Sequence, residues 1–250
     1  MQCCRPLFCS AVNDNHPSGL RKQPKIFGES DISIRSIREP VLDMTRVIGT
    51  NEEGIKETAE IVRRGGVVAF PTDTVYGLGC DPFNSDAVDR LLIAKKRVKG
   101  VLPILVSSLD EAMKIGRFND SAKGLSERFW PGPLTLVVPL RAKLSTRISD
   151  GTPFIGLRIP NLVMTRKLID ECGGSLVGTS ANLSGNPSPR TANDVIRDLG
   201  GRIDLVLDGG SVPIGVESTV VRVADNVVVL REGAIARDSF LEFLVPARLA

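Results

Sequence analysis

Residues 67–79 have the sequence VVAFPTDTVYGLG, in which an apolar run passes directly into a polar segment with glycines. The run Val67–Phe70 predicts a buried strand, because short continuous apolar runs are typical of strands covered on both faces. Thr72, Asp73 and Thr74 then supply hydroxyls and a carboxylate, and the glycines allow the backbone to approach a ligand closely. The alternative is a tight turn whose hydroxyls bond only to its own backbone. The sequence thus predicts either a ligand-binding loop or a simple polar turn after a buried strand.

Helix and strand patterns alternate on both sides of this segment from Thr45 onward, without an internal repeat. Local signals set the boundaries, such as Asn51 as a helix cap and Gly65-Gly66 as a helix stop. The expected helices are 52–64, 85–97, 121–130, 162–172 and 191–199, and the expected strands are 67–70, 104–106, 134–140, 155–158, 176–178, 205–207, 219–223 and 227–230. The sequence therefore predicts an α/β fold, with a mixed sheet because the last two strands are close enough to form a hairpin.

The ends of the chain are expected to lie outside this fold. Residues 1–44 mix Pro, Asn, Ser, Gly and basic residues without sustained periodicity, which predicts a disordered or loosely attached N-terminal extension. The extension has no small-residue cleavage site after an apolar core, so it does not resemble a secretory signal, and Met44 is an alternative start. We therefore predict one domain over 45–240 and a C-terminal tail over 241–250.

Composition excludes several classes of function. The chain of 250 residues has a net charge of +3, and no apolar run approaches the roughly 20 residues of a membrane-spanning helix. Its single histidine, His16, lies in the extension, which excludes histidine general-base catalysis and His-rich metal sites from the folded body. Cys80 and Cys172 have no C-x-x-C spacing and are expected to be buried thiols in a reducing, cytoplasmic compartment. A cysteine nucleophile would therefore lack a basic partner.

Cations mark the ends of two predicted elements. Lys95-Lys96-Arg97 closes a helix, where cations also complement the helix dipole, so a solvated final turn is the alternative to a ligand site. Arg158 ends an otherwise apolar strand and is followed by Ile159-Pro160. Its planar guanidinium suits a carboxylate, which belongs either to a structural Asp or Glu or to a substrate.

Three further polar segments lie in the second half of the chain. Residues 178–185, GTSANLSG, followed by Ser188, offer hydroxyls, amides and glycines after a strand, which fits a phosphate or adenosine site as well as a capped loop. Residues 217–221, ESTVV, and 231–233, REG, flank the final hairpin, where an ordinary strand start and hairpin exit are the alternatives. The sequence has no G-x-x-x-x-G-K-[ST] phosphate loop, so a nucleotide would bind through another set of loops.

In this order, the motifs resemble the YrdC domain of threonylcarbamoyl-AMP synthases. The set consists of PTDTVYGLG, KKR, WPGPLTLV, GLRIP, GTSANLSG, ESTVV and LREGAI, and the similarity covers about residues 45–240. The resemblance implies a single YrdC-like domain of the short form, with a twisted, mixed and mostly parallel sheet, flanking helices and a basic concave face. It also implies the conversion of L-threonine, bicarbonate and ATP into threonylcarbamoyl-AMP and pyrophosphate, the first step of threonylcarbamoyladenosine (t6A) formation in tRNA.

The resemblance assigns roles to individual residues. The L-threonine ligands would be Thr74, Ser107, Arg158 and Ser218. The catalytic groups that face the phosphates would be Lys95 and Arg97, and the ATP ligands would be Lys95, Arg97, Ser180, Asn182, Ser188 and Arg231. Mg2+ would arrive with ATP rather than at a metal site of the protein. The expected partners are a downstream tRNA threonylcarbamoyl transferase and, through a possible contact, tRNA, with no membrane.

The chain departs from the family pattern where phosphate contacts are expected. Lys96 and Val98 replace the glycine and proline of the usual K-G-R-P, and an apparent one-residue insertion precedes Pro103-Ile104. Glu232 replaces the proline of the closing R-P-G.

Two other functions fit parts of this pattern. A non-catalytic module that binds double-stranded RNA or tRNA would use the basic face, although Phe, Trp and Tyr, the residues suited to base stacking, make up only 4% of the chain. A carbamoyl-transfer accessory domain would also fit, but the chain lacks the zinc-finger cysteines and neighbouring domains of the larger proteins that contain one.

Overall fold

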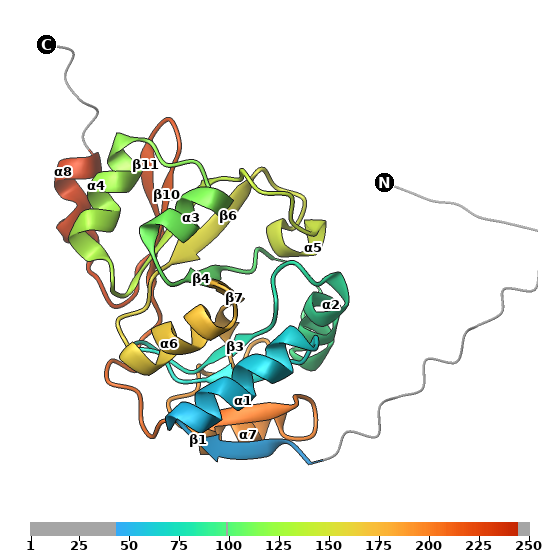
Figure 1. Cartoon of the computed structure of the whole chain (residues 1–250). Helices are drawn as coiled ribbons and strands as arrows, with labels where there is room; N and C mark the ends of the chain where they lie inside the picture. The colour runs from blue at the N-terminus through green and yellow to red at the C-terminus, as the bar shows by residue number, and fades with distance from the viewer. Residues whose placement is uncertain (1–43, 99, 245–250) are drawn as a thin grey trace, which may run out of the picture. The chain divides into compact units, whose positions relative to one another are not determined.

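The computed structural model describes residues 44–98 and 100–244, and the predicted N-terminal extension therefore lies almost wholly outside the described residues. The described strands form two mixed sheets, with helices packed against them (Figure 1). Sheet A has five strands in the order β1-β9-β2-β3-β8, and sheet B has six in the order β11-β10-β5-β6-β4-β7. The predicted α/β class and the mixed pairing are confirmed.

Sheet A brings together strands from both ends of the described chain. Its strands are β1 (Arg46–Gly49), β9 (Leu205–Asp208), β2 (Val68–Phe70), β3 (Gly77–Gly79) and β8 (Thr179–Ser180). β9 runs parallel to both β1 and β2, whereas β3 is antiparallel to β2 and β8. Because only a short loop joins β2 to β3, these strands cannot form a parallel crossover.

Sheet B contains the longer strands. They are β11 (Val227–Arg231), β10 (Thr219–Val223), β5 (Leu134–Pro139), β6 (Phe154–Arg158), β4 (Ile104–Val106) and β7 (Ser175–Val177). The predicted hairpin of β10 and β11 is confirmed, while β5 pairs in parallel with β10 and antiparallel with β6. The expectation of one mostly parallel sheet is wrong, because the strands divide between two sheets and antiparallel pairs occur in both.

Side-chain caps begin several helices, and the predicted cap Asn51 is confirmed, whereas Thr191, expected as the first residue of its helix, is the cap before it. Asn51 accepts a hydrogen bond from Gly54 N at 2.8 Å, and Thr191 forms a reciprocal capping box with Asp194. The helices are α1 (Glu52–Arg63), α2 (Ser85–Ala94), α3 (Leu109–Ile115), α4 (Asp120–Phe129), α5 (Thr146–Ser149), α6 (Val163–Glu171), α7 (Ala192–Leu199), the 3-10 helix η1 (Arg237–Phe240) and α8 (Leu241–Leu244). α8 thus occupies the start of the segment that was expected to be a tail.

Two apolar cores hold the sheets and helices together. α1 and α6 lie side by side over sheet A, where Ile55, Ala59 and Leu168 pack with the strand residues Val68 and Leu205 (Figure 1). The larger core lies around sheet B and α2, α4 and α7. Burial of these apolar side chains is the main stabilising contribution to such a fold. No helix among residues 44–98 and 100–244 is long and apolar enough to cross a membrane.

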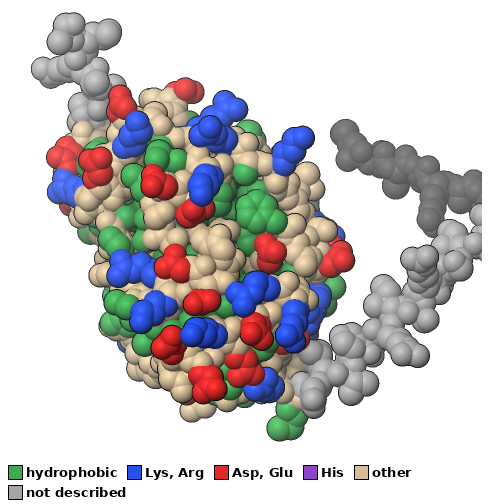
Figure 2. Space-filling view, viewed as in Figure 1, with side chains coloured by type: hydrophobic (Ala, Val, Ile, Leu, Met, Phe, Trp, Pro, Cys, Tyr) green, Lys and Arg blue, Asp and Glu red, His purple; other side chains and the backbone are tan. Residues whose placement is uncertain are grey.

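The charged side chains on the face shown in Figure 2 alternate in sign. Lys and Arg lie beside Asp and Glu over most of this face, without a continuous basic surface. Ion pairs at the surface include Lys56 with Glu52 along α1 and Arg90 of α2 with Asp204, which directly precedes β9. The basic residues that bear on function instead line a cavity on sheet B.

Candidate active site

A cavity of about 340 Å³ lies on one face of sheet B. Five neighbouring strands contribute to it, and alternate residues such as Thr135 and Val137 of β5, or Gly156 and Arg158 of β6, face it together. The loop after β2, strand β3 and strand β8 of sheet A complete the wall. Of the residues predicted from the sequence, the cavity brings together Thr74, Arg97, Arg158, Ser180, Ser218 and Arg231.

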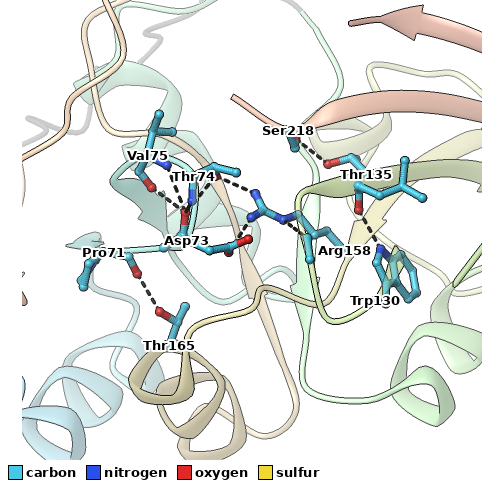
Figure 3. A network of polar contacts seen from close by, with 12 residues as sticks. Pro71, Asp73, Thr74, Val75, Trp130, Thr135, Arg158, Thr165 and Ser218 are labelled. Atoms are coloured by element: carbon cyan, nitrogen blue, oxygen red, sulfur yellow. Dashed lines mark hydrogen bonds and ion pairs between the residues drawn. The ribbon is translucent and has the colours of Figure 1, made fainter. Parts of the chain in front are cut away.

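Arg158 is the most tightly held of these residues, with 5% of its surface exposed. Its Nε donates to Gly132 O at 2.9 Å, Nη1 to Thr74 Oγ1 at 2.8 Å and Nη2 to Asp73 Oδ1 at 2.6 Å (Figure 3). Burial lowers the pKa of Arg158, and the charge of Asp73 opposes that shift. Because each terminal nitrogen carries a second N–H, donors remain for a ligand. The structural alternative is therefore realised, because Asp73 is a carboxylate partner of Arg158, and since Arg158 also lines the cavity, a substrate carboxylate stays a prediction.

The loop after β2 is fixed by its own hydroxyls. Thr72 Oγ1 donates to Val75 O at 2.6 Å, accepts from Thr74 N at 3.1 Å and lies 3.0 Å from Thr74 Oγ1. Thr165 Oγ1 of α6 donates to Pro71 O at 2.7 Å and holds the start of the loop (Figure 3). The self-bonded turn that the sequence offered as an alternative is thus present, and it orients Thr74 toward Arg158.

The second half of this segment corrects the prediction of a polar turn, because residues 77–79 form strand β3. A Cβ atom at Gly77 would lie 2.9 Å from the ring of Phe70, closer than such atoms approach one another. Glycine is therefore required for close packing on β2. It also forms part of the cavity wall.

Ser218 lies across the cavity from the loop, at the start of β10. Its hydroxyl shares a hydrogen bond of 2.8 Å with the hydroxyl of Thr135 on the neighbouring strand β5 (Figure 3). A serine hydroxyl has one donor and two acceptor positions, so this bond leaves capacity for a ligand.

The basic segment does not continue helix α2 as predicted, because the helix ends at Ala94. Arg97 N donates to Leu92 O at 2.9 Å and Lys96 N to Ile93 O at 3.0 Å, which is the pattern of a Schellman cap. Lys96 has a φ of 52°, the left-handed value usually taken by glycine. It stands at the position where the resemblance expects glycine, and the cap turns Lys95 and Arg97 away from the helix axis.

Lys95 is buried rather than solvated, with 2% of its surface exposed. Its Nζ donates to Asn182 O at 2.9 Å and to Ser180 O, which ties the basic segment to the loop after β8. Burial lowers the pKa of Lys95 to about 8, and the charge of Arg97 adds to that shift. Asn182 folds the same loop by donating from Nδ2 to Asn186 O at 2.6 Å.

A second hollow adjoins the cavity on this side. It contains Lys95 and Asn182, and it shares Arg97, Ser180 and Glu217 with the first cavity. The shared residues show that the two hollows meet. The resemblance assigned both Lys95 and Asn182 to ATP, and the direct bond from Lys95 Nζ to Asn182 O joins these residues although they lie 87 positions apart in the chain.

Glu217 is a site residue that the sequence prediction missed. Its carboxylate accepts a hydrogen bond from Ser188 Oγ at 2.5 Å and forms an ion pair with Arg231 Nη1. Arg231 Nη2 also donates to Ser218 O at 2.9 Å. Ser188 and Arg231, which were predicted on the nucleotide side, are therefore joined through one carboxylate. The available signal was its position directly before Ser218 in the ESTVV motif.

Two predicted site residues, Ser107 and Ser188, line neither hollow, although Ser188 donates to Glu217, which lines both. β4 ends at Val106, and Ser107 N donates to Gly174 O at 3.2 Å, beside the turn that leads into β7. Leu105 lines the cavity, but Ser107 lines neither hollow. The assignment of Ser107 to L-threonine therefore stays a prediction from the resemblance, to which the cavity lining adds no support.

The cysteines do not supply a nucleophile. Burial raises the pKa of the Cys80 and Cys172 thiols to about 12, so both are protonated at neutral pH. Cys80 is buried as predicted, whereas Cys172 is only partly buried. Within residues 44–98 and 100–244, no group of three or more His, Cys, Asp or Glu side chains could hold a metal ion.

Fold and site together define an α/β domain that offers fixed arginines, a buried lysine and hydroxyls to small anionic ligands. A profile of the Sua5/YciO/YrdC family, described as "telomere recombination", matches residues 60–233. The chain belongs to this family, which confirms the resemblance seen in its motifs.

Relatives and solved structures agree with this assignment. Threonylcarbamoyl-AMP synthase of Bacillus subtilis (strain 168) is 41% identical over 210 residues, which are 82% of this chain and 60% of that protein. The crystal structure of Pyrococcus abyssi Sua5 complexed with L-threonine has a TM-score of 0.75 and 35% identity, and the match covers 80% of this chain and 60% of that one. Escherichia coli YciO has a TM-score of 0.68 and 26% identity, with 76% and 95% covered. The chain thus spans about 60% of the length of the Bacillus subtilis relative.

Proposed function

We propose that this protein synthesises threonylcarbamoyl-AMP from L-threonine, bicarbonate and ATP and releases pyrophosphate, as the first step of t6A formation. The observation that carries the proposal is the joining of two kinds of binding group in one space. Thr74, Arg158 and Ser218 line the cavity together with Arg97, which the second hollow shares, and with Arg231, which is paired with the shared Glu217. An amino acid and a triphosphate can therefore lie in contact.

L-Threonine would bind at the buried end. The free N–H groups of Arg158 suit its carboxylate, because a planar guanidinium pairs with both oxygens of a carboxylate. The hydroxyls of Thr74 and Ser218 are candidates for the substrate hydroxyl. Valine would leave these buried groups without a partner, so the site would reject it more strongly than an apolar pocket could.

ATP would bind where the two hollows meet. Lys95, Arg97 and Arg231 would lie near its phosphates, while Asn182 and Ser188 shape the loop beside them. Mg2+ bound to ATP would neutralise part of the phosphate charge. The carboxylate of Glu217, a hard oxygen donor on the shared wall, fits that ion.

The reaction would proceed by placing the reactants rather than by acid–base chemistry of histidine. The threonine amine bonds to the carbon of CO2 and loses a proton, or bonds to the carbon of bicarbonate with loss of water, and either route gives a carbamate. A carbamate oxygen then attacks the α-phosphorus. The bond from that phosphorus to the bridging oxygen breaks, and pyrophosphate leaves. Positioning of this kind supplies about 7–11 kcal/mol of a barrier. Lys95, Arg97 and Arg231 would stabilise the charge that develops on the phosphates.

The product would pass to a downstream tRNA threonylcarbamoyl transferase, since a carbamate–phosphate anhydride is a reactive donor. Contact with tRNA belongs to the same proposal. A cytoplasmic location is supported by the free thiols of Cys80 and Cys172, which suit a reducing compartment.

The test is pyrophosphate release by the purified protein. Release should require L-threonine, bicarbonate and ATP together, and AMP should appear in a threonylcarbamoyl conjugate detected by mass spectrometry. Absence of threonine-dependent release from the folded protein contradicts the proposal.

A matched pair of serine variants tests the assigned pocket. Ser218→Ala should reduce the preference for threonine over valine by about tenfold, the effect of losing about 1.4 kcal/mol from one hydrogen bond. Ser107→Ala should leave this preference unchanged, because Ser107 lines neither hollow. Equal effects of the two changes would remove Ser218 from its assigned role.

A further inference from the structure

Glu217 places a negative charge among cations. It is the one carboxylate among the described residues that line either hollow, and it lines both. Arg231 forms an ion pair with it, Ser188 donates to it at 2.5 Å, and its charge acts on Lys95 by raising that residue's pKa against the effect of burial. The carboxylate therefore lies where the proposed function puts the triphosphate.

A carboxylate beside a triphosphate is unfavourable unless a cation lies between them, because like charges at short range repel. Glu217 is not held in place as a buried structural partner, since 36% of its side chain is exposed. Its ion pair with Arg231, whose side chain is 48% exposed, can therefore exchange partners at little cost. A phosphate that takes the guanidinium of Arg231 leaves the carboxylate free for another cation.

We propose that Glu217 is the protein ligand of the Mg2+ that accompanies ATP, an inference that rests on the proposed function. Mg2+ is commonly held by one or two carboxylates together with substrate phosphates and water. The donor set fits this arrangement, because Glu217 supplies one hard oxygen ligand and no cluster of three or more ligating side chains exists among the described residues. Asp198, the other carboxylate whose charge acts on Lys95, already binds Leu183 N and Asn186 Nδ2.

The experiment measures metal binding apart from turnover. Mn2+ is titrated into the complex of the protein with a non-hydrolysable ATP analogue, and free Mn2+ is followed by electron paramagnetic resonance. Glu217→Gln keeps the size of the side chain and an acceptor for Ser188 but removes the charge. It should weaken Mn2+ binding by at least about tenfold, the lower end of the loss caused by removing even an outer partner of a metal site. Binding of the analogue in the presence of EDTA should be unchanged or tighter, because a negative charge beside the phosphates is gone.

The matched control is Glu232→Gln, which makes the same charge change at an exposed carboxylate that lines neither hollow. It should bind Mn2+ as the unmodified protein does. Glu217→Asp, which retains the charge on a shorter side chain, should give an intermediate Mn2+ affinity and serves if the glutamine variant does not fold. Circular dichroism verifies the fold of each variant.

The outcomes separate this inference from the proposed function. If Glu217→Gln binds Mn2+ as tightly as the unmodified complex does, the metal assignment is wrong while the nucleotide site stands. If Glu217→Gln weakens the analogue equally with and without metal, Glu217 only orients Arg231 and the assignment is again wrong. If the unmodified protein binds no analogue at all, the proposed function and the metal assignment fall together.

Discussion

The site contains two arginine–carboxylate pairs that differ in almost every other respect. In the pair of Arg158 and Asp73, the side chains are 6% and 4% exposed, and all three guanidinium nitrogens of Arg158 donate hydrogen bonds. In the pair of Arg231 and Glu217, the side chains are 48% and 36% exposed. The first pair fixes the geometry of the buried end. The second lies at the open end, where a ligand can replace one partner.

Burial decides how each pair behaves. Separation of a buried pair leaves an uncompensated charge in a medium that cannot solvate it. Separation of an exposed pair returns both groups to water and changes stability little. The buried end around Arg158 and Asp73, where the amino acid would bind, is thus predicted to be rigid before any ligand arrives. The open end around Arg231 and Glu217, where the phosphates would bind, is predicted to rearrange on binding.

The largest expected effect comes from removing the buried arginine. Arg158→Ala leaves Asp73 buried without its partner and should lower the free energy of unfolding by about 3–5 kcal/mol, together with loss of threonine-dependent turnover. Arg231→Ala should change it by no more than about 1 kcal/mol, because its pair is exposed. Urea unfolding of both variants measures the difference. Similar losses from the two variants would contradict the contrast between the pairs.

A double variant sharpens the same comparison. Asp73→Ala combined with Arg158→Ala should be less destabilised than the sum of the single changes, since no unpaired charge remains buried. Additive losses would show that the two side chains do not act as a pair.

The next effect concerns turnover rather than folding. Arg97→Ala should reduce turnover by an amount that corresponds to about 2.7–4 kcal/mol, the usual cost of losing one well-aimed donor to a developing anion. Its unfolding curve should stay close to that of the unmodified protein. Steady-state pyrophosphate release provides the measurement, and Arg97→Lys, which retains the charge, is the control. Turnover close to normal in Arg97→Ala would remove Arg97 from the phosphate end.

The third effect is a pH dependence of the phosphate end. Turnover should fall as the pH rises through about 8, because Lys95 loses its charge there. Stability should behave in the opposite way. Between about 8 and the ordinary lysine pKa of 10.5, the unfolded chain retains a proton that the folded chain has released, so this contribution to stability rises with pH.

Two pH profiles distinguish these effects. Pyrophosphate release is measured beside thermal unfolding from pH 7 to 10, with Lys95→Arg as the control, because arginine stays charged throughout. A decline in turnover that is identical in Lys95→Arg would assign it to another group.

The smallest expected effect is on stability and concerns the turn at Lys96, which follows the end of α2. Lys96 adopts a left-handed φ of 52° at the end of α2, which costs a residue with a side chain more than glycine. Lys96→Gly should raise the free energy of unfolding by about 0.5–1 kcal/mol, after allowing for the greater entropy of glycine in the unfolded chain. Urea unfolding measures this, and Lys96→Ala, which keeps a Cβ atom, should give no such gain. Destabilisation by glycine would contradict the account of the turn.

Local patterns predicted most of the fold. The Asn51 cap of α1 and the final hairpin depend on neighbouring residues, and the structure confirms them. Strands β1, β3 and β8, helices α3, α5 and α8 and the 3-10 helix η1 were missed. β1 and β8 are short, and each pairs with a strand far along the chain, β1 with β9 and β8 with β3. The glycines of β3 suggested a turn, whereas their actual role is close packing on Phe70.

Site residues could be predicted where they belong to a sequence motif. They could not be predicted where their role depends on contacts with residues elsewhere in the chain. Thr74, Arg158 and Ser218 were found from motifs and do meet. The role of Glu217 depends on Arg231 and Ser188, which lie at other positions in the chain, and no local pattern contains that information. Ser107 was placed by a family position, but it follows the end of β4 at Val106 and lines neither hollow.

The cavity draws its lining from Thr72 through Arg231, and sheet B is completed only by the β10–β11 hairpin. During synthesis the chain leaves the ribosome from its N-terminus. The loop that contains Thr72 and Thr74 therefore emerges early, and Arg231 of β11 emerges almost last. A nascent chain that has not yet exposed this hairpin therefore lacks part of the cavity lining, Arg231 included. The complete cavity forms only after nearly the whole domain has been translated.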